Sequence, residues 1–422
     1  MGPRIEEVKG KSQGTDDYFS NGGMTETVLA VSALCWNSKG YSLAVGYSFL
    51  GHWGWCSHRS FFRVFSLSNK QEEFEVEGCV SALSFLPNGS SVIVGTFNGV
   101  IFNWNIETGD IISRSSIDEY QHREAVSGFC WVKNGQFTLF SCSTDGKVLN
   151  WNPENLEFPV RGVLIKGKNE LEGATSLSIT EDSGALIITA ESGKVFKYNI
   201  PIISTQSLPN DGFKLKPEAE IVLNNLNPTF RQQLLKIAGK YCLDNGQKEI
   251  DIKSLFFTKP DIMKCYPSNM SLAYERHDGP VTEVACNPFH RNLFATCSLD
   301  GSIKIFNALQ SRALLVLEPV LASKVQTVSW SEVRPLVMAV GYNNGSVYLY
   351  DFLQSKTQQV LEIPNARNSV SKLKFNPIIK DYLLIGYRTG DCKLFQLPEI
   401  FNVAHPDEIR RLNMFLESVI NE

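Results

Sequence analysis

Two sets of residues in this sequence carry the side chains that hydrolases use. His122, Ser143 and Asp145 could serve as the base, nucleophile and orienting acid of a catalytic triad. A hydrolase that presents its serine on a sharp turn needs a Gly-x-Ser-x-Gly segment, and the sequence contains none. The same three residue types recur in the same order further along the chain, as His277, Ser298 and Asp300. This recurrence indicates a repeated structural unit rather than one catalytic centre.

An aromatic residue accompanies each set, Trp151 in the first and Phe306 in the second. A buried structural network around the aspartate would account for all of these residues. A buried carboxylate is stable only when several donors offset its desolvation, and imidazole, hydroxyl and turn amide groups provide them. We therefore predict no catalytic residue. The expected structural networks are a full one, His122, Ser143, Asp145 and Trp151, and a partial one, His277, Ser298 and Asp300.

The sequence also lacks the motifs of cofactor and metal chemistry. It has no phosphate-binding Gly-x-x-x-x-Gly-Lys-Ser/Thr loop, no His-Glu-x-x-His and no Gly-x-Gly-x-x-Gly after a strand. The ten cysteines form no Cys-x-x-Cys pair, and the six histidines show no metal-ligand spacing. We therefore expect no metal and no cofactor, and buried cysteines that act as small apolar residues.

Composition places the chain among globular proteins, with 43% apolar and 20% charged residues in 422. Forty basic and forty-four acidic residues give a net charge of −4, which does not favour nucleic acid as a partner. The charged N-terminus has no signal-peptide core, and no apolar stretch approaches the ~18–20 residues of a membrane span. We expect a soluble intracellular chain with reduced cysteines and no membrane insertion.

An internal repeat positions both networks. Each unit has three short alternating apolar runs, typical of half-buried strands. The seven units are residues 32–67, 81–106, 127–153, 175–200, 282–308, 326–352 and 371–397. In six of them a tight turn links the last two runs, namely Asn98-Gly99, Asp145-Gly146, Ser192-Gly193, Asp300-Gly301, Asn344-Gly345 and Thr389-Gly390. An aromatic residue follows the first turn residue by six positions in all six.

The aromatic anchors give the period of the repeat. They are Phe65, Trp104, Trp151, Tyr198, Phe306, Tyr350 and Phe395, separated by 39, 47, 47, 108, 44 and 45 residues. A period of about 40–45 residues with four strands per unit is that of a WD-repeat propeller. We predict an all-β, seven-bladed WD-repeat β-propeller over residues 31–397, with the long step caused by an insertion at 201–270 between blades four and five. Residues 1–30 precede the ring, and a strand within 18–29 is expected to complete the last blade.

Two helices are expected outside the ring. Residues 228–240 begin with Pro228, end near Gly239, and place Phe230, Leu234, Ile237 and Ala238 on one face. We favour packing of this helix on its own propeller over packing on a partner. In residues 398–422, a helix beginning at Pro406-Asp407 has a stripe of Ile409, Leu412, Leu416, Val419 and Ile420. This stripe either packs on the rim or is available to another chain.

Two surfaces are candidates for partner binding. The blade-one loop, residues 48–59, replaces the tight turn and holds Trp53 and Trp55 beside His52 and His58. These indoles either fold back onto the rim or contact a partner, since aromatic residues are enriched at interfaces. On the links between first and second strands, Phe289, His290 and Arg291 in blade five and Arg334 in blade six should form a second patch, or remain simply solvated.

The repeat units resemble those of WD-repeat dynein intermediate chains, and within that family most resemble the smaller intermediate chains of cytoplasmic dynein 2, the retrograde intraflagellar-transport motor. The similarity covers residues 32–397, and its more specific segments are CWNSKGYSLAVGYSFLGHWGW, STDGKVLNW, GATSLSI, HDGPVTEVACNPFHRNLF and VQTVSWSEVRPLVMAVGYNNGSVYLYD.

The resemblance implies a non-catalytic motor subunit whose propeller binds the heavy-chain tail. It further implies pairing with a second intermediate chain, loading on intraflagellar-transport trains, and a location in the cytoplasm, cytoskeleton, cilium and ciliary base. Family members bind light chains through a long N-terminal extension. About thirty residues precede the first strand here, which does not favour light-chain binding.

Two other functional classes remain open at this point. A WD-repeat substrate receptor of a ubiquitin ligase commonly shows Trp-Asp-x-Arg at the end of the third strand. The corresponding segments here start at Trp104, Trp151 and Tyr350 and contain no arginine. A propeller enzyme would instead need carboxylates or metal ligands that converge on the central channel.

Overall fold

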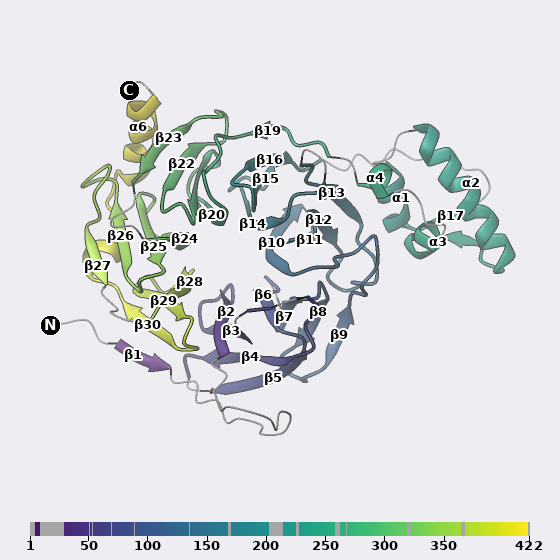
Figure 1. Cartoon of the computed structure of the whole chain (residues 1–422), viewed down its shortest axis with the longest axis horizontal. Helices are drawn as coiled ribbons and strands as arrows, with labels where there is room; N and C mark the ends of the chain where they lie inside the picture. Colours follow the sequence, from purple (N-terminus) through teal and green to yellow (C-terminus); the bar gives the residue numbers. More distant parts are fainter. Residues whose placement is uncertain are drawn as a thin grey trace.

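A computed structural model shows how the repeat units are arranged. It describes residues 5–8, 29–49, 51–52, 54–68, 70–87, 89–134, 136–167, 170–201, 214–224, 228–257, 262–266, 268–318, 323–363 and 368–420. Seven four-stranded antiparallel sheets stand around a central axis as the blades of a propeller, which confirms the predicted fold (Figure 1).

The blades follow the chain in order, and the first strand of each lies next to the axis (Figure 1). Blade one is β2 (Leu29–Trp36), β3 (Ser42–Phe49), β4 (Arg59–Ser66) and β5 (Gln71–Glu77). Blade two is β6 (Val80–Phe85), β7 (Ser91–Thr96), β8 (Ile101–Asn105) and β9 (Ile111–Arg114). Blade three is β10 (Val126–Asn134), β11 (Gln136–Ser143), β12 (Lys147–Trp151) and β13 (Arg161–Leu164). Blade four is β14 (Ala174–Ile179), β15 (Ala185–Ala190), β16 (Val195–Asn199) and β19 (Leu272–Ala273).

The remaining blades complete the circle. Blade five is β20 (Val281–Cys286), β21 (Leu293–Ser298), β22 (Ile303–Asn307) and β23 (Ala313–Leu317). Blade six is β24 (Val325–Trp330), β25 (Val337–Tyr342), β26 (Val347–Asp351) and β27 (Leu361–Ile363). Blade seven is β28 (Val370–Phe375), β29 (Tyr382–Tyr387), β30 (Cys392–Gln396) and β1 (Ile5–Val8).

The core lies between neighbouring blades. All six residues of β7, β15, β21 and β25 are buried, because each second strand has an adjacent blade on both faces. Strands buried in this way lose the polar alternation of a half-exposed sheet. The tight turns require glycine: Gly99 has φ +87°, and a Cβ there would lie 2.7 Å from the backbone of His122 in the next blade link.

The ring closes through an N-terminal strand, although not the one predicted. β1 pairs with β30 in antiparallel register, from Ile5 opposite Phe395 to Val8 opposite Cys392. The predicted closing segment, 18–29, has only Leu29 among the described residues, and this residue begins blade one. An N-terminal strand thus lies beside β30, at residues 5–8 and not within 18–29, and residues 18–28 lie outside the described residues.

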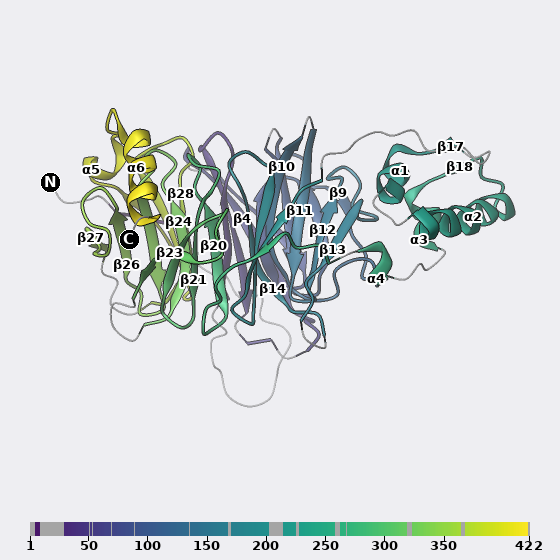
Figure 2. The ribbon, with the colours of Figure 1, turned by 90° about the horizontal axis from the view of Figure 1, so that it is seen from above.

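The insertion leaves the ring after β16 and returns before β19, so it interrupts blade four rather than following it. It contains β17 (Lys214–Leu215), α1 (Pro217–Asn224), α2 (Pro228–Asp244), β18 (Glu249–Ile250), α3 (Ile252–Phe257) and α4 (Ile262–Cys265). These elements project outward beside blade three (Figures 1 and 2). Tyr266 fastens them there, because its hydroxyl donates to the Tyr120 carbonyl over 2.9 Å and its ring covers Gly162.

The helix at 228–240 is longer than predicted. It continues through the buried Gly239 to Asp244, and Gly246, at φ +67°, follows its end. Leu234 and Ala238 are buried as expected, whereas Ile237 is 55% exposed. The insertion packs on its own propeller through a core shared with blade three, as favoured from the sequence.

Two helices follow the last blade, α5 (Glu399–Asn402) and α6 (Glu408–Ile420), and α6 lies beside β23 (Figure 1). Leu412, Phe415 and Leu416 are buried in the core of blades five and six, whereas Ile409 is exposed. The helix therefore packs on the rim, the first of the two alternatives. Among the described residues, no helix combines the length and apolar character that crossing a membrane requires.

Candidate functional site

The blade-three network is buried and links three elements. His122, in the link before β10, places Nε2 2.7 Å from the Ser141 hydroxyl and Nδ1 3.4 Å from an Asp145 carboxylate oxygen. The Trp151 indole N–H donates to the same Ser141 hydroxyl over 2.7 Å. His122 and Trp151 are completely buried. The predicted link between histidine, turn carboxylate and tryptophan therefore exists.

The serine in this network is Ser141, and the assignment to Ser143 is wrong. The Ser143 hydroxyl instead accepts a hydrogen bond from the Asp145 amide over 3.2 Å and donates one to the Glu124 carbonyl over 3.0 Å. Both serines lie on one face of β11, but Ser141 is two residues closer to the middle of the strand, where it reaches the indole. A hydroxyl residue four positions before the turn aspartate would have been the better sequence signal, since Thr296 has this position in blade five.

Asp145 is held as a carboxylate by the groups around it. Burial alone would raise its pKa, but the His122 ring, the Lys147 ammonium 3.3 Å away and the Arg123 amide outweigh it and hold the pKa well below its usual range. The Lys147 ammonium also donates to the Gln121 carbonyl over 2.6 Å. The turn of blade three is thereby bonded to the link that precedes the blade.

Blade five repeats the arrangement with a threonine. His277 Nε2 lies 2.8 Å from the Thr296 hydroxyl, and Nδ1 lies 2.9 Å from the Ser302 hydroxyl and 3.5 Å from Asp300. Ser298, predicted as the hydroxyl partner, accepts the Asp300 amide at 3.2 Å instead and does not contact the ring. Burial lowers the pKa of His277 to about 4, although Asp300 opposes the shift, so the imidazole is neutral at pH 7.

The hydroxyl groups at the centre of the two networks already take part in hydrogen bonds inside the blade, which disfavours hydrolase chemistry. Ser141 lies between an indole N–H and an imidazole nitrogen, and all three groups are buried in the blade. A nucleophile must reach its substrate, and a fully enclosed hydroxyl has no path to one. This burial agrees with a structural role for the networks, which stays a prediction.

Arg334 is a structural residue and not part of an exposed patch. It is completely buried, with Nε 3.0 Å from a Glu408 carboxylate oxygen and Nη1 2.9 Å from an Asp351 oxygen. Nη1 also donates to the Ile400 carbonyl. The arginine thus joins the link between β24 and β25 to α5 and α6. Its predicted role in partner binding is wrong, because the C-terminal helices cover it.

The rest of the predicted patch is accessible. Arg291 is exposed, and Phe289 and His290 are partly buried beside it. We call Phe289, His290 and Arg291 the blade-five surface. Burial and the neighbouring Arg291 lower the pKa of His290. The guanidinium of Arg291 also helps to lower the pKa of Asp182, which burial would raise, so this part of blade four lies near it.

The blade-one loop is fastened to blade two. The side-chain amide of Asn98 makes two hydrogen bonds with the backbone of Cys56. Its oxygen accepts from the Cys56 N–H over 2.9 Å, and its nitrogen donates to the Cys56 carbonyl over 2.8 Å. Trp55, directly before this clamp, is 65% exposed. Its indole therefore remains available on the face opposite the blade-five surface, since links between first and second strands and between second and third strands lie at opposite ends of a blade. Trp53 lies outside the described residues.

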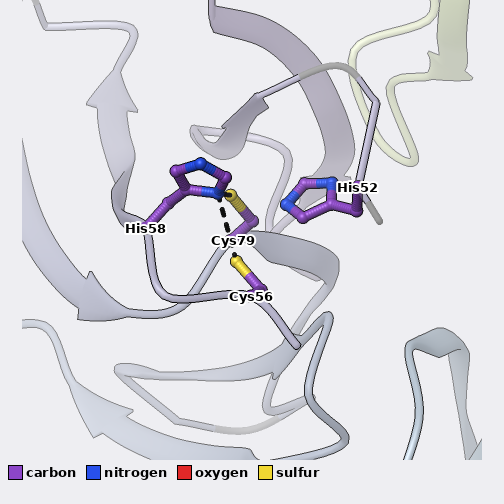
Figure 3. A group of neighbouring side chains, drawn as sticks. All are labelled: His52, Cys56, His58 and Cys79. Carbon is purple, nitrogen blue, oxygen red and sulfur yellow. Dashed lines mark hydrogen bonds between the residues drawn. The ribbon is translucent and has the colours of Figure 1, made fainter. Parts of the chain in front are cut away.

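The same loop brings together side chains that the sequence spacing does not suggest. His52, Cys56 and His58 come from the loop and Cys79 from the link between β5 and β6 (Figure 3). One possible ligand atom from each residue lies within 4.8 Å of the others. Sequence spacing did not indicate this group, because its members come from two separate segments of the chain.

The central channel contains a cavity of about 280 Å³ lined by the first strands of the blades. Its buried Glu283 lies 2.9 Å from the Lys374 ammonium and 3.8 Å from that of Lys372. Burial would raise the pKa of Glu283, but the two lysines lower it. A carboxylate neutralised in this way is a structural ion pair rather than a base held ready for catalysis.

Comparisons with known proteins agree with this geometry. The family described as WD domain, G-beta repeat matches residues 114–152 and 269–307, which contain the two networks. Cytoplasmic dynein 2 intermediate chain 2 of Mus musculus is 26% identical over 411 residues, covering 91% of this chain and 68% of its own. The Homo sapiens protein of that name is 26% identical over 411 residues, covering 93% and 70%. Dynein axonemal intermediate chain 2 of Homo sapiens is 23% identical over 347 residues, covering 80% and 48%.

The fold and its repeats define the chain as a WD-repeat β-propeller. Within that class it is similar to the dynein intermediate chains over almost its whole length, which confirms the resemblance predicted from its motifs. The matched family and these relatives indicate a WD40 scaffold and no enzyme family.

The first prediction distinguishes the two serines of blade three. Ser141→Ala leaves the Trp151 N–H and His122 Nε2 buried without partners, which should cost about 2–4 kcal/mol. Ser143→Ala removes only bonds to the backbone of the turn and of the link before β10, and it should cost about 1 kcal/mol. Urea unfolding of both variants measures the difference. An equal or larger loss for Ser143→Ala would contradict the assignment.

The second prediction concerns pH. Because the pKa of His277 is lower in the folded chain than in the unfolded one, the unfolded chain binds the proton first as the pH falls. The stabilisation is present above the ordinary pKa near 6.5 and is lost toward pH 4, by at most roughly 3 kcal/mol. His277→Gln should flatten the decline of Tm between these pH values. The exposed His405→Gln is the control, and an unchanged slope in His277→Gln would count against the account.

The third prediction tests the role of Arg334. Arg334→Leu leaves the carboxylates of Asp351 and Glu408 buried without their cation, which should cost about 3–5 kcal/mol. The matched substitution at an exposed position, Arg291→Leu, should change the free energy of unfolding by no more than about 0.5 kcal/mol. Thermal unfolding of the two variants decides, and similar melting temperatures would show that Arg334 does not hold the C-terminal helices.

Proposed function

We propose that this chain is a non-catalytic intermediate chain of the intraflagellar-transport dynein and binds the heavy-chain tail through its propeller. The observation that carries the proposal is similarity to cytoplasmic dynein 2 intermediate chain 2 over 91–93% of the chain. A match of that extent passes through the whole ring and not only through the recurrent WD40 units.

The structure supports a rigid adaptor role. The candidate catalytic side chains are enclosed in blades three and five, and Glu283, one of the two glutamates that line the channel cavity, is paired with lysines. A propeller of this kind offers loops on two opposite faces as binding surfaces. The chain would act by holding these loops in fixed positions while the heavy chain supplies motor activity.

The proposed setting follows from the relatives. Cytoplasmic and axonemal dynein intermediate chains both match, so association with the cytoskeleton and cilium is the coarse expectation. We further propose pairing with a second intermediate chain and attachment to intraflagellar-transport trains at the ciliary base. Light-chain binding is not part of the proposal.

We propose the blade-five surface as the contact with the heavy chain. Arg291 is exposed, and its planar guanidinium suits the acidic groups of a partner. Phe289 supplies an aromatic ring beside it, and such pairs of residues are common in interface centres. The exposed Trp55 on the opposite face is the competing contact.

The fourth prediction is a co-purification experiment in ciliated cells depleted of the endogenous protein. Tagged wild-type chain should recover dynein heavy chain, identified by mass spectrometry. Arg291→Glu should reduce this recovery by about tenfold or more, because a cation in the interface is replaced by a repelling charge. Arg388→Glu, exposed in blade seven, serves as the matched control.

Each other outcome has a definite meaning. Undiminished recovery with Arg291→Glu and loss with Trp55→Ala would move the contact to the opposite face. Recovery of cullin adaptors without heavy chain from wild-type protein would overturn the proposed function and indicate a ubiquitin-ligase receptor.

A further inference from the structure

The blade-one loop gathers four side chains whose atoms are the usual ligands of zinc. The Cys56 sulfur lies 3.5 Å from His58 Nδ1, and the Cys79 sulfur lies 4.0 Å from the same nitrogen. With His52, all four ligand atoms fall within 4.8 Å of one another. The four side chains point toward one another around a common centre (Figure 3).

These separations suit tetrahedral coordination. Zinc binds imidazole nitrogen at about 2.0–2.1 Å and thiolate sulfur at about 2.3 Å, which puts neighbouring ligand atoms about 3.3–3.8 Å apart. The distance from the Cys56 sulfur to His58 Nδ1, 3.5 Å, lies within this range, and that from the Cys79 sulfur, 4.0 Å, lies just above it. All four ligand atoms lie within 4.8 Å of one another, so rotation of the side chains toward a bound ion would have to bring them closer to complete the geometry.

A second observation points to a missing ligand. His52 Nε2 is buried and has no hydrogen-bond partner, in contrast to most buried polar atoms of the described residues. The ring is held in place by stacking on Phe97, with centroids 3.9 Å apart and planes 19° apart. A fixed imidazole with an unsatisfied nitrogen is costly unless another group binds that nitrogen.

We propose that His52, Cys56, His58 and Cys79 bind a structural zinc ion that joins blades one and two. Two imidazoles and two sulfurs are the donor set that favours zinc, and the group contains no carboxylate of the kind that magnesium or calcium prefers. Four protein ligands close the coordination sphere, so the ion would have a structural and not a catalytic role.

The surroundings of the site are built to hold its ligands. Asn98 of the β7–β8 turn clamps the backbone of Cys56, and the His58 carbonyl accepts the Gly78 amide over 3.0 Å. Ser60 donates to the Gly78 carbonyl over 2.8 Å and accepts the Val80 amide over 2.9 Å, on either side of Cys79. Outer contacts of this kind orient the ligands of metal sites.

The site would explain how a long loop without secondary structure keeps a defined shape. Among the described residues, its supports include the Asn98 clamp, the His52–Phe97 stack, the contact of the His58 ring with Phe49 and the bonds around Gly78. Zinc would tie the loop to the link between β5 and β6 and so fix the exposed Trp55, which directly precedes a ligand. The inference does not depend on the proposed dynein role.

The fifth prediction is tested on the purified full-length chain expressed with zinc in the medium. Mass spectrometry of the metal content should find about one zinc per chain. Replacement by cobalt(II) should give the thiolate charge-transfer absorption of a mixed sulfur and nitrogen site. A chelator should lower Tm, and zinc but not magnesium should restore it. None of these measurements requires a variant that might fail to fold.

Variants then assign the ligands. His52→Gln and the pair Cys56→Ser, Cys79→Ser should lose the metal, whereas Cys35→Ser and His405→Gln, outside the group, should retain it. Wild-type protein that takes up no zinc or cobalt would overturn the proposal, as would metal retained by the ligand variants. A Cys56–Cys79 disulfide in the freshly purified chain would also contradict it, because coordination requires both thiolates.

Discussion

Each blade of this ring is apolar on both faces, and a four-stranded sheet of that kind is stable in water only between two neighbours. All positions of the second strands in blades two, four, five and six are buried, and this burial comes from the adjacent sheets. The first blade therefore needs the last, and the chain must supply a strand that completes the circle. β1 does this by pairing with β30, which places residues 5–8 and 392–396 in one sheet. Closure of the circle holds the blades, and the links between their strands, in fixed positions around the axis.

Buried polar networks join the links, turns and rim helices to the blades. In blades three and five, a histidine from the preceding link joins the turn aspartate to a hydroxyl within the blade. Arg334 does the same at the rim, where two carboxylates from different elements share its charge and hold α6 on blades five and six. Such buried ion pairs add little stability over an apolar equivalent, but removing one member is costly. They therefore act mainly to fix which elements meet.

The sequence predicted the parts of the structure that repeat. Seven units, six glycine turns and their aromatic anchors follow from local spacing, and the glycines occupy the positive φ that such turns require. It did not predict contacts made between elements that are distant along the chain. Arg334 is paired with Glu408, 74 residues further along the chain, and Cys79 meets the blade-one loop from the other end of blade one. Ser141 and Ser143 lie on the same strand face, and the contacts of Ser141 with His122 and Trp151 distinguish them. The networks that belong to the repeat could therefore be predicted to within a few residues. The contacts of Arg334 and Cys79, which lie outside the repeat pattern, could not.

The central claim is that this closed ring is a non-catalytic subunit seated on a dynein heavy chain. Cryo-electron microscopy of the motor complex purified through this chain tests it most directly. The account predicts density for a seven-bladed ring, with α6 on blades five and six, in contact with the heavy-chain tail through Phe289 and Arg291. A particle in which this ring is bound to other proteins and no heavy chain is present would contradict the account.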